Sequence, residues 1–360
     1  MRDCLNDSSK PSVSASAPSN ALLGAVKRLT AGTAPDPAEL TAAFEVVLRG
    51  DATPVQIAAL LVGLRVKGET PDELAAVVRA LRMAMVVLPA DRPEELVDTC
   101  GTGGGTIQTF NISTAAALLV AGAGVRVAKH GNRSFTTQCG SADVLEALGV
   151  SIVAPPETMA DALRQAGIVF MFAPLMHPAM RHVGPVRSEL GVQTVMNLVG
   201  PLANPAHAGR QVVGVSDLRR LTLMSGALRE LGSNHALVVH GEGMDEVSPF
   251  AETQVVEVRD GTLSEWTIDP ARYGISGGTV EDLAGGPPQQ NAEAIMRVLR
   301  GEANAASAGA VVLNAAAAFY VSGSVPDFGA GVDAAREAIK SGAGVLALER
   351  LRAAFAPRSV

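Results

Sequence analysis

Aromatic residues are scarce in this 360-residue chain: nine Phe, two Tyr and one Trp make up 3% of it, whereas apolar residues make up 48%. A core with so few large rings must rely on Ala, Val and Leu, which suits tightly packed helices and parallel strands. So few rings leave little for stacking on bases, and the net charge of −7 gives no general attraction to nucleic acid. The composition favours the α/β class and disfavours a nucleic-acid partner.

Cysteine and long hydrophobic runs are also lacking. Cys4, Cys100 and Cys139 show neither a close-pair metal spacing nor an even count suited to a disulfide framework, so reduced thiols are expected. The longest apolar run, near residues 115–125, is about half the ~20 residues needed to span a bilayer. We therefore expect no membrane partner and a cytoplasmic location.

The chain begins with a segment unlike the rest. Residues 1–20 are rich in Ser, Pro and Ala and lack the apolar core of a signal peptide, so they are expected to form a disordered leader. Residues 21 to about 90 are typical of successive helices. Thr53 and Thr70 each precede a Pro and stand three residues before Gln or Glu, a pattern that predicts two capped helix starts.

An apolar stripe follows the second predicted helix start. Its residues recur at helical spacing, so they would lie along one side of a helix. Such a stripe needs a partner, which is either another helix or another subunit. The stripe comprises Leu74, Val77, Val78, Leu81 and Met85.

From Leu96 the pattern changes to short apolar runs, each followed by glycine-rich turns and Ala-rich helical stretches. The helical stretches are long enough to serve as parallel crossovers. The sequence therefore predicts a mostly parallel sheet in an α/β fold. The expected strands include residues 96–98, 125–128, 212–215 and 237–239.

One segment has no acidic residue: residues 99–142 contain neither Asp nor Glu, although acids outnumber bases by 36 to 29 in the chain. Glycines after a strand let backbone amides approach a ligand, and a helix N-terminus directs N–H groups and a positive dipole at it. These features predict a phosphate or pyrophosphate site. The segment contains Gly101-Thr102-Gly103-Gly104-Gly105, Asn111-Ile112-Ser113-Thr114 and Lys129-His130-Gly131-Asn132-Arg133.

Other interpretations of this segment compete with the phosphate site. The glycine cluster alone would equally suit a tight connection. A dinucleotide site is disfavoured because the sixth residue from Gly101 is Thr106 and no acid stands ~20 residues further on, and the ending of a P-loop is missing. Residues 129–133 could be a solvated turn, but they follow the expected strand 125–128, and carboxyl ends of parallel strands are where ligands bind.

Asp245 and Glu246 follow the expected strand 237–239, again at a carboxyl end. In a loop, both carboxylates can reach hydrated Mg²⁺, which prefers a few carboxylates together with phosphate oxygens. Alone, such a pair is more often a solvated acidic turn. Beside a pyrophosphate site, it indicates a magnesium site.

His177, Arg181, His182 and Arg187 lie within eleven residues. A metal role for the two histidines is disfavoured, because a separation of five does not place both on one helical face. A guanidinium grips a carboxylate at two points, so Arg187 is predicted to recognise a carboxylate.

Several motifs, taken in order from about Ala21 to the C-terminus, closely resemble those of the anthranilate phosphoribosyltransferase family. Besides the three segments of residues 99–142, they are Gly140-Ser141-Ala142-Asp143-Val144-Leu145-Glu146, His177-Pro178-Ala179-Met180, Asn197-Leu198-Val199-Gly200-Pro201-Leu202-Ala203-Asn204-Pro205 and Asp245-Glu246. The resemblance implies transfer of the ribosyl phosphate of phosphoribosyl pyrophosphate to the amine of anthranilate, a step of tryptophan biosynthesis, with Mg²⁺ as cofactor.

The resemblance also implies a fold of the nucleoside phosphorylase and phosphoribosyltransferase class. A small helical domain, residues 21–92 with a contribution from about 176–196, would join an α/β phosphoribosyl pyrophosphate-binding domain over residues 93–360. The active site would lie in the cleft between them. Homodimers would form through the helical domain.

Site residues are carried over by position. Phosphoribosyl pyrophosphate would contact Gly101, Gly104, Gly105, Thr109, Asn111, Ile112, Ser113, Thr114, Lys129, His130, Gly131, Asn132, Arg133, Ser134, Phe135, Thr136, Thr137 and Ser141. Anthranilate would contact Gly101, Asn132 and Arg187, and magnesium would contact Ser113, Asp245 and Glu246. Lys129, His130 and Arg187 would be the catalytic residues.

Two departures from the family pattern stand out. Gly105 replaces the usual Asp at the end of the glycine loop, and Gln138 replaces a Lys. Two other functions stay open at this point. A pyrimidine nucleoside phosphorylase would lack the context of Asn132 and Arg187, and a non-catalytic nucleic-acid-binding relative would carry a basic cleft.

Overall fold

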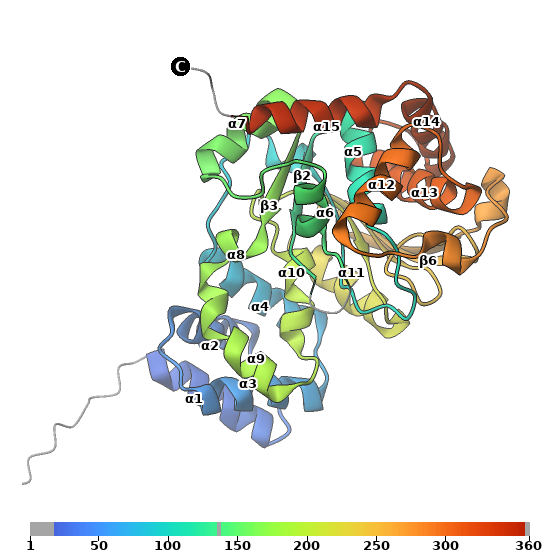
Figure 1. The fold of residues 1–360 in the computed structure, drawn as a ribbon. Coiled ribbons are helices and arrows are strands. Elements are labelled where there is room, and N and C mark those ends of the chain that lie inside the picture. Colours follow the sequence, from blue (N-terminus) through green and yellow to red (C-terminus); the bar gives the residue numbers. More distant parts are fainter. Residues whose placement is uncertain (1–17, 135–137, 357–360) are drawn as a thin grey trace, which may run out of the picture.

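The computed structural model of the protein describes residues 18–134 and 138–356. It has two parts, a small lobe of helices and a larger lobe built on a seven-stranded sheet (Figure 1). The predicted fold, a small helical domain beside a larger α/β domain, is confirmed.

The small lobe is formed by helices α1 (Pro18–Thr30), α2 (Pro37–Arg49), α3 (Pro54–Lys67) and α4 (Pro71–Met83). Helix α1 begins within the stretch expected to be a leader, whose first 17 residues lie outside the described ones. Thr53 and Thr70 are the N-caps of α3 and α4, and each forms a capping box with the Gln or Glu three residues on. Both predicted helix starts are therefore confirmed.

The apolar stripe of α4 is buried inside the chain. Its five residues, Leu74, Val77, Val78, Leu81 and Met85, are each at most 8% exposed. Helix α4 packs against α2 and against α11 (Leu221–Glu230), which covers the sheet. The partner of the stripe is thus other helices of the same chain.

A later part of the chain joins the small lobe. Helix α9 (Gly184–Leu190) packs on α3, and the short helix η2 (Pro178–His182) packs on α2.

The sheet has the strand order β3-β2-β1-β4-β5-β6-β7. The first five strands are parallel, and β6 and β7 extend the sheet in antiparallel fashion. The predicted mostly parallel sheet is confirmed. The strands are β1 (Val97–Gly101), β2 (Val127–Gly131), β3 (Ile168–Phe172), β4 (Arg210–Gly214), β5 (His235–His240), β6 (Thr253–Arg259) and β7 (Thr262–Ile268).

One boundary differs from the prediction. Lys129, His130 and Gly131 were expected in a turn, but they belong to β2 and pair with Phe170, Met171 and Phe172 of β3. The prediction of a turn was wrong because Lys129 and His130 are buried and have polar partners that the local sequence does not reveal.

Helices cover both faces of the sheet. One face packs against α5 and α13, with α12 lying on α5 and α6, while the other face packs against α11, so that its core continues into the helical lobe. The remaining helices are α5 (Ile112–Gly122), α6 (Ser141–Ala147), α7 (Pro156–Ala166), α8 (Ala173–Met176), α10 (Val199–Leu202), α12 (Pro288–Leu299), α13 (Ala305–Ser322), α14 (Phe328–Lys340) and α15 (Ala343–Ala354). Short 3-10 helices are η1 (Pro93–Glu95), η3 (Val195–Asn197), η4 (Leu218–Arg220), η5 (Pro270–Tyr273) and η6 (Val280–Leu283).

Helix α13 is long and apolar enough to cross a membrane by length and composition alone. Within the fold, 78% of this stretch is buried, and it packs against α5, α14 and the sheet. It therefore has the surroundings of a core helix.

Candidate active site

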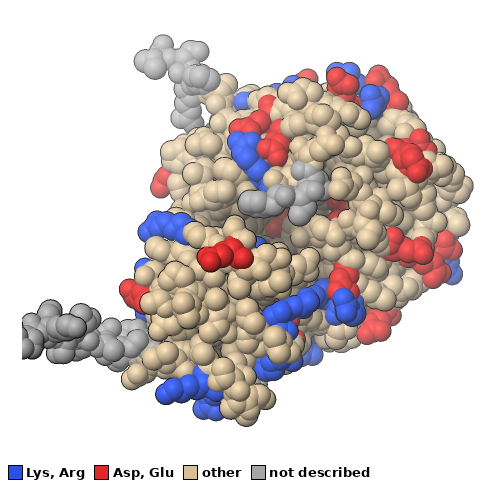
Figure 2. Space-filling model, turned by 60° about the horizontal axis from the view of Figure 1, so that its bottom comes forward, with Lys and Arg blue, Asp and Glu red and all other residues tan. Residues whose placement is uncertain are grey.

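The carboxyl ends of β1, β2, β4 and β5 meet at one edge of the sheet, because these strands are parallel neighbours. The glycine loop follows β1, Lys129 and His130 lie at the end of β2, and the turn with Asp245 and Glu246 follows β5. The edge therefore brings together three segments that the sequence predicted to share a site. A hollow opens on the face of the molecule drawn in Figure 2.

Two glycines let the acidic turn lie directly on this edge. Gly101 ends β1 and pairs in register with Gly214, which ends β4. A Cβ atom on either residue would overlap atoms of Asp245. At Gly214 the overlap is with the backbone of Asp245, so only glycine permits this approach of the turn to the end of β4, whereas at Gly101 the nearest atom is a carboxylate oxygen that can move.

Asp245 joins the acidic turn to the glycine loop. Its Oδ2 accepts a hydrogen bond of 2.7 Å from the backbone N–H of Gly103. Gly103 and Gly104 have φ values of 67° and 77°, in the left-handed region that favours glycine. The loop conformation thus depends on its glycines, and it presents backbone N–H groups to an anionic group.

Glu246 joins the same turn to the N-terminus of α5. Its Oε1 accepts a hydrogen bond of 3.2 Å from the backbone N–H of Ser113. Asn111, the N-cap residue, makes no side-chain hydrogen bond to the helix, so a carboxylate from elsewhere in the chain takes this N–H group. The end of α5 therefore already holds an anionic group, as its dipole favours.

Lys129 is buried between β1 and α5. Its Nζ donates to the carbonyl of Thr99 and, at 3.3 Å, to the Oγ of Ser113. The ammonium group therefore lies beside the start of α5, where it adds a full positive charge to the helix dipole.

Burial raises the pKa of both carboxyl groups of the acidic turn, and for Glu246 the pKa is raised to about 8, with Asp245 adding to the effect and Lys129 opposing it. Such a rise means that the ionised pair lacks sufficient positive charge around it. Two carboxylates and the Ser113 hydroxyl are hard oxygen donors that fit Mg²⁺, which completes its shell with water and substrate phosphate. The described residues contain no group of three or more His, Cys, Asp or Glu side chains that could hold a metal.

His130 and His177 form a second buried group at this edge, with ring centroids 4.9 Å apart. Nε2 of His130 and both ring nitrogens of His177 have no hydrogen-bond partner among the described residues. Burial lowers the pKa of His130 to about 3 and that of His177 to about 4. Both imidazoles are therefore neutral at neutral pH.

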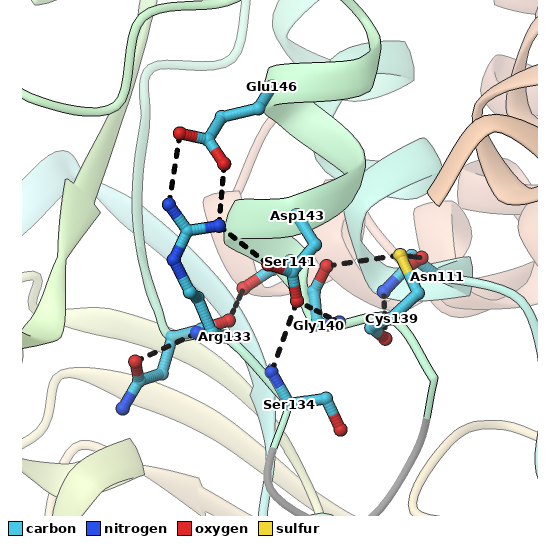
Figure 3. Close-up of polar contacts among 9 residues, drawn as sticks. Asn111, Arg133, Ser134, Cys139, Gly140, Ser141, Asp143 and Glu146 are labelled. Carbon is cyan, nitrogen blue, oxygen red and sulfur yellow. Dashed lines mark hydrogen bonds and ion pairs between the residues drawn. The ribbon is translucent and has the colours of Figure 1, made fainter. Parts of the chain in front are cut away.

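The turn after β2 is anchored through α6 (Figure 3). Arg133 binds Glu146 with bonds of 2.5 and 3.0 Å and Asp143 with a bond of 2.7 Å. The other oxygen of Asp143 accepts the N–H groups of Ser134 and Gly140. The guanidinium of Arg133 thus ties the turn to α6.

The remaining predicted contacts of phosphoribosyl pyrophosphate divide into three groups. Phe135, Thr136 and Thr137 lie outside the described residues. Ile112 and Thr114 are buried at the start of α5, and Thr114 Oγ1 has no hydrogen-bond partner among the described residues. Thr109 bridges to Ala284, and Ser141 Oγ donates to the carbonyl of Asn132.

Arg187, the predicted acceptor-binding residue, is on α9 of the helical lobe and is half-buried. Within the described residues its guanidinium makes no hydrogen bond or ion pair. Burial lowers the pKa of this guanidinium, which has no carboxylate partner to offset the cost. An unpaired, partly buried guanidinium suits an anionic ligand group.

A surface cavity of about 430 Å³ lies elsewhere, beside α6, α12 and α15. None of the predicted site residues lines it. The residues that line it are Ala147, Leu148, Gln289, Ala292, Glu293, Met296, Arg297, Arg300 and Arg352.

Comparison with known proteins agrees with this division. Residues 93–345 match a glycosyl transferase family α/β domain, and residues 24–85 match the helical bundle domain of a glycosyl transferase family. Anthranilate phosphoribosyltransferase of Phenylobacterium zucineum is 46% identical over 339 residues, which cover 94% of this chain and 100% of the relative. The chain belongs to the anthranilate phosphoribosyltransferase family.

Solved structures of this family have the same fold. The crystal structure of the Thermus thermophilus enzyme superposes with a TM-score of 0.87 at 45% identity, covering 92% of this chain and 98% of that one. The Saccharomyces cerevisiae enzyme, in complex with phosphoribosyl pyrophosphate and Mg, gives 0.84 at 26% identity over 92% and 97% of the two chains. Membership of the anthranilate phosphoribosyltransferase family supports the main functional prediction over the phosphorylase and the nucleic-acid-binding alternatives.

Both departures from the family pattern occur in the loops of the site. A Cβ at Gly105 would lie 2.7 Å from the carbonyl oxygen of Gly243, which also accepts the N–H groups of Thr106 and Ile107. The missing side chain thus allows direct backbone contact between the glycine loop and the acidic turn. Gln138 is exposed, and the neighbouring Cys139 is buried, with its Sγ 3.4 Å from Asn111 Oδ1.

Three buried asparagines that were assigned no role from the sequence support the site residues through hydrogen bonds. The side-chain amide of Asn204 donates to Oδ2 of Asp98, and Oδ1 of Asp98 accepts the backbone N–H of His130. Asn291 of α12 donates to Asn111, and Asn314 of α13 bonds the backbone of Val247. A single polar residue within an Ala-rich apolar helix, as at position 314, is the signal that could have marked one of them.

Proposed function

We propose that this protein transfers the 5-phosphoribosyl group of phosphoribosyl pyrophosphate to the amine of anthranilate, giving N-(5-phosphoribosyl)anthranilate and pyrophosphate. The observation that carries the proposal is the sheet edge where the glycine loop, the start of α5, Lys129 and a carboxylate pair meet. These are the groups needed to hold a pyrophosphate as it departs. Full-length identity of 46% to a family member supports the same reaction.

Cleavage of the bond between ribose C1 and pyrophosphate leaves positive charge on the sugar and negative charge on the leaving group. We assign the negative charge to the N–H groups of the glycine loop and of α5 and to the ammonium of Lys129. The N–H groups of Gly103 and Ser113 now bind Asp245 and Glu246, so substrate phosphate would exchange with these carboxylates. The predicted contacts at Asn132 and Ser134 would hold the rest of phosphoribosyl pyrophosphate.

The carboxylates so released, with the Ser113 hydroxyl, would hold Mg²⁺. When bound, the ion neutralises the charge of pyrophosphate and lowers the barrier to its departure. The raised pKa values of Asp245 and Glu246 support this role, because a cation would stabilise their ionised forms. The yeast family member has been solved with both phosphoribosyl pyrophosphate and Mg.

We assign the acceptor to Arg187 and Asn132, with Gly101 at the floor of the site. The guanidinium of Arg187 would bind the carboxylate of anthranilate and turn the amine toward C1, which is catalysis by positioning. An aniline nitrogen needs little activation, so no strong base is required. His130, whose lowered pKa keeps it neutral, is the candidate proton acceptor.

We further propose a cytoplasmic homodimer that forms through the helical domain, residues 21–92 with the contribution from about 176–196. Valine side chains on the outer face of α3 support this interface, since Val55 and Val66 are 78% and 82% exposed and Val62 lies between them. The α/β domain would occupy residues 93–360. Sedimentation of the purified protein would measure the assembly.

The decay of anthranilate fluorescence with phosphoribosyl pyrophosphate and Mg²⁺ tests the reaction. A decay that requires both additions is expected, and phosphorolysis of thymidine should not be detectable. Absence of the decay, or phosphorolysis in its place, would contradict the proposal.

A further inference from the structure

Asn314 is an isolated polar residue in the apolar helix α13, and its side chain is only 3% exposed. Its amide is fully bonded. Oδ1 accepts the N–H of Val247 at 3.0 Å, and Nδ2 donates to the carbonyl of Val247 at 3.0 Å and to that of Ala310 at 2.9 Å. Two of these three bonds therefore go to one residue outside the helix.

Val247 directly follows Glu246, the second carboxylate of the acidic turn. A side-chain amide bonded to both the N–H and the carbonyl of one residue fixes the position and the direction of that backbone segment. The Val247 side chain is itself fully buried, which anchors the same point. Helix α13 thus fixes the place where the acidic turn re-enters the core.

The carboxylates have few other attachments within the described part of the chain. Asp245 accepts the N–H of Gly103, and Glu246 accepts that of Ser113. Both donors belong to segments assigned to the substrate, so these bonds are exchanged when the substrate binds. Asn314, which lines the same small gap as Ser113 and Glu246, is not exchanged.

We propose that Asn314 is a positioning residue that holds the Asp245–Glu246 turn in the geometry needed to bind magnesium with pyrophosphate. The proposal deepens, and rests on, the function proposed above. Groups that orient metal ligands typically change metal affinity by 10–100-fold when they are replaced. A purely structural role would alter the stability of the fold without altering the metal dependence of binding.

Calorimetric titration with pyrophosphate, with Mg²⁺ and with a chelator in its place, separates these roles. Asn314→Leu removes all three bonds and should weaken magnesium-dependent binding by about 10–100-fold. Binding without metal should stay within about twofold of that of the unaltered protein. Asn314→Ala leaves room for water to bond the Val247 backbone. This variant replaces Asn314→Leu in the titration if the Leu variant does not fold.

Asn304→Ala is the matched control. Asn304 caps the same helix by accepting the N–H of Ser307 at 2.7 Å, and it is exposed. Its replacement should lower the melting temperature, because the N-terminus of α13 loses its side-chain cap. Its magnesium-dependent binding should equal that of the unaltered protein.

A double-mutant cycle makes the test specific. In a Glu246→Gln background, Asn314→Leu should add little further loss, because its effect acts through that carboxylate. Three results would overturn the proposal. They are equal weakening of pyrophosphate binding with and without Mg²⁺, additive losses in the cycle, and the same weakening in Asn304→Ala. An unaltered protein that binds magnesium pyrophosphate but does not consume anthranilate would refute the proposed function alone.

Discussion

Two glutamates of this molecule have opposite surroundings. Glu257, on β6, has His235 Nε2 at 2.8 Å and accepts hydrogen bonds of 2.9 Å from Tyr320 and Trp266. Glu246, at the carboxyl edge of the parallel strands, accepts one N–H group of the described residues, that of Ser113 at 3.2 Å. The pKa of Glu257 is lowered, because its hydrogen bonds and His235 outweigh its burial, whereas burial raises the pKa of Glu246.

The contrast separates a carboxylate that is satisfied within the fold from one that we propose binds a ligand. Buried polar groups are normally hydrogen-bonded, so a lack of partners indicates a missing component or a functional role. Six buried side-chain atoms among the described residues have no partner, and four of them belong to Thr114, His130 and His177. Most of the buried polar atoms without a partner among the described residues therefore lie at the carboxyl edge of the parallel strands. None of them lies on the antiparallel strands β6 and β7.

The strongest test of the contrast is removal of the carboxylate pair. The double variant Asp245→Ala, Glu246→Ala should abolish turnover, because the magnesium that accompanies pyrophosphate loses its protein ligands. The fold should be retained, since burial already disfavours the ionised carboxylates. Anthranilate fluorescence and thermal unfolding, measured on the same preparation, check both statements. Unchanged activity would remove the pair from the mechanism.

Arg187 tests the same contrast with a cation, because its guanidinium has no hydrogen-bond or ion-pair partner in the part of the chain that the structure describes. Arg187→Ala should raise the Michaelis constant for anthranilate by at least about tenfold, since loss of one member of a buried charge pair costs about 2 to 5 kcal/mol. The constant for phosphoribosyl pyrophosphate should move much less. Steady-state kinetics with each substrate varied in turn measure both. Equal weakening of the two, or of neither, would contradict the assignment of Arg187 to the acceptor.

Glu257 is the counterpart test, in which stability should change and activity should not. Glu257→Gln should lower the free energy of unfolding at pH 7 by about 1–3 kcal/mol, because it weakens bonds to a charged acceptor. The folded-state pKa of Glu257 lies below the ordinary 4.5, so its stabilising contribution is present above pH 4.5 and is lost as the pH falls through the folded-state pKa.

Urea unfolding followed by Trp266, the single tryptophan, measures this difference. The difference in the free energy of unfolding between the unaltered protein and Glu257→Gln should become smaller when the pH is lowered from 7 to below 4.5. A gap that is constant with pH would show that the charge of Glu257 does not matter. Loss of turnover in Glu257→Gln would mean that the antiparallel strands β6 and β7 influence the site.

The sequence predicted features that depend on local chemistry. Thr53 and Thr70 could be assigned as caps because a capping box lies within four residues, and the acid-free segment predicted an anion site without any tertiary information. The hairpin of β6 and β7 was not predicted, although Asp260-Gly261 between its strands is a common hairpin turn, with φ values of 49° and 77°.

Features that depend on distant partners could not be predicted. Arg133 was assigned to the substrate from its motif, whereas its guanidinium binds Asp143 and Glu146, which lie just beyond the acid-free segment. Asn314 is 67 residues from Val247 in the sequence, and nothing near either residue indicates their contact. Burial of Lys129 likewise depends on α5 and β1.

Gly105 gives the smallest expected effect and the finest comparison within the site. Restoring the family residue with Gly105→Asp adds a carboxylate to the loop that contacts the acidic turn. It also places a Cβ 2.7 Å from the Gly243 carbonyl, a distance that obliges one of the two loops to shift. Asp245 lies two residues from Gly243, so this shift should reach the proposed metal ligands.

We therefore expect Gly105→Asp to change the dependence of the rate on magnesium or phosphoribosyl pyrophosphate without creating or destroying activity. Gly105→Ala separates the two causes, because it brings the same Cβ without the charge. If both variants shift the magnesium titration alike, the contact with Gly243 is responsible. If only the Asp variant does so, the new carboxylate takes part in binding. Titrations of both variants that superimpose on those of the unaltered protein would show that position 105 has no influence on the site.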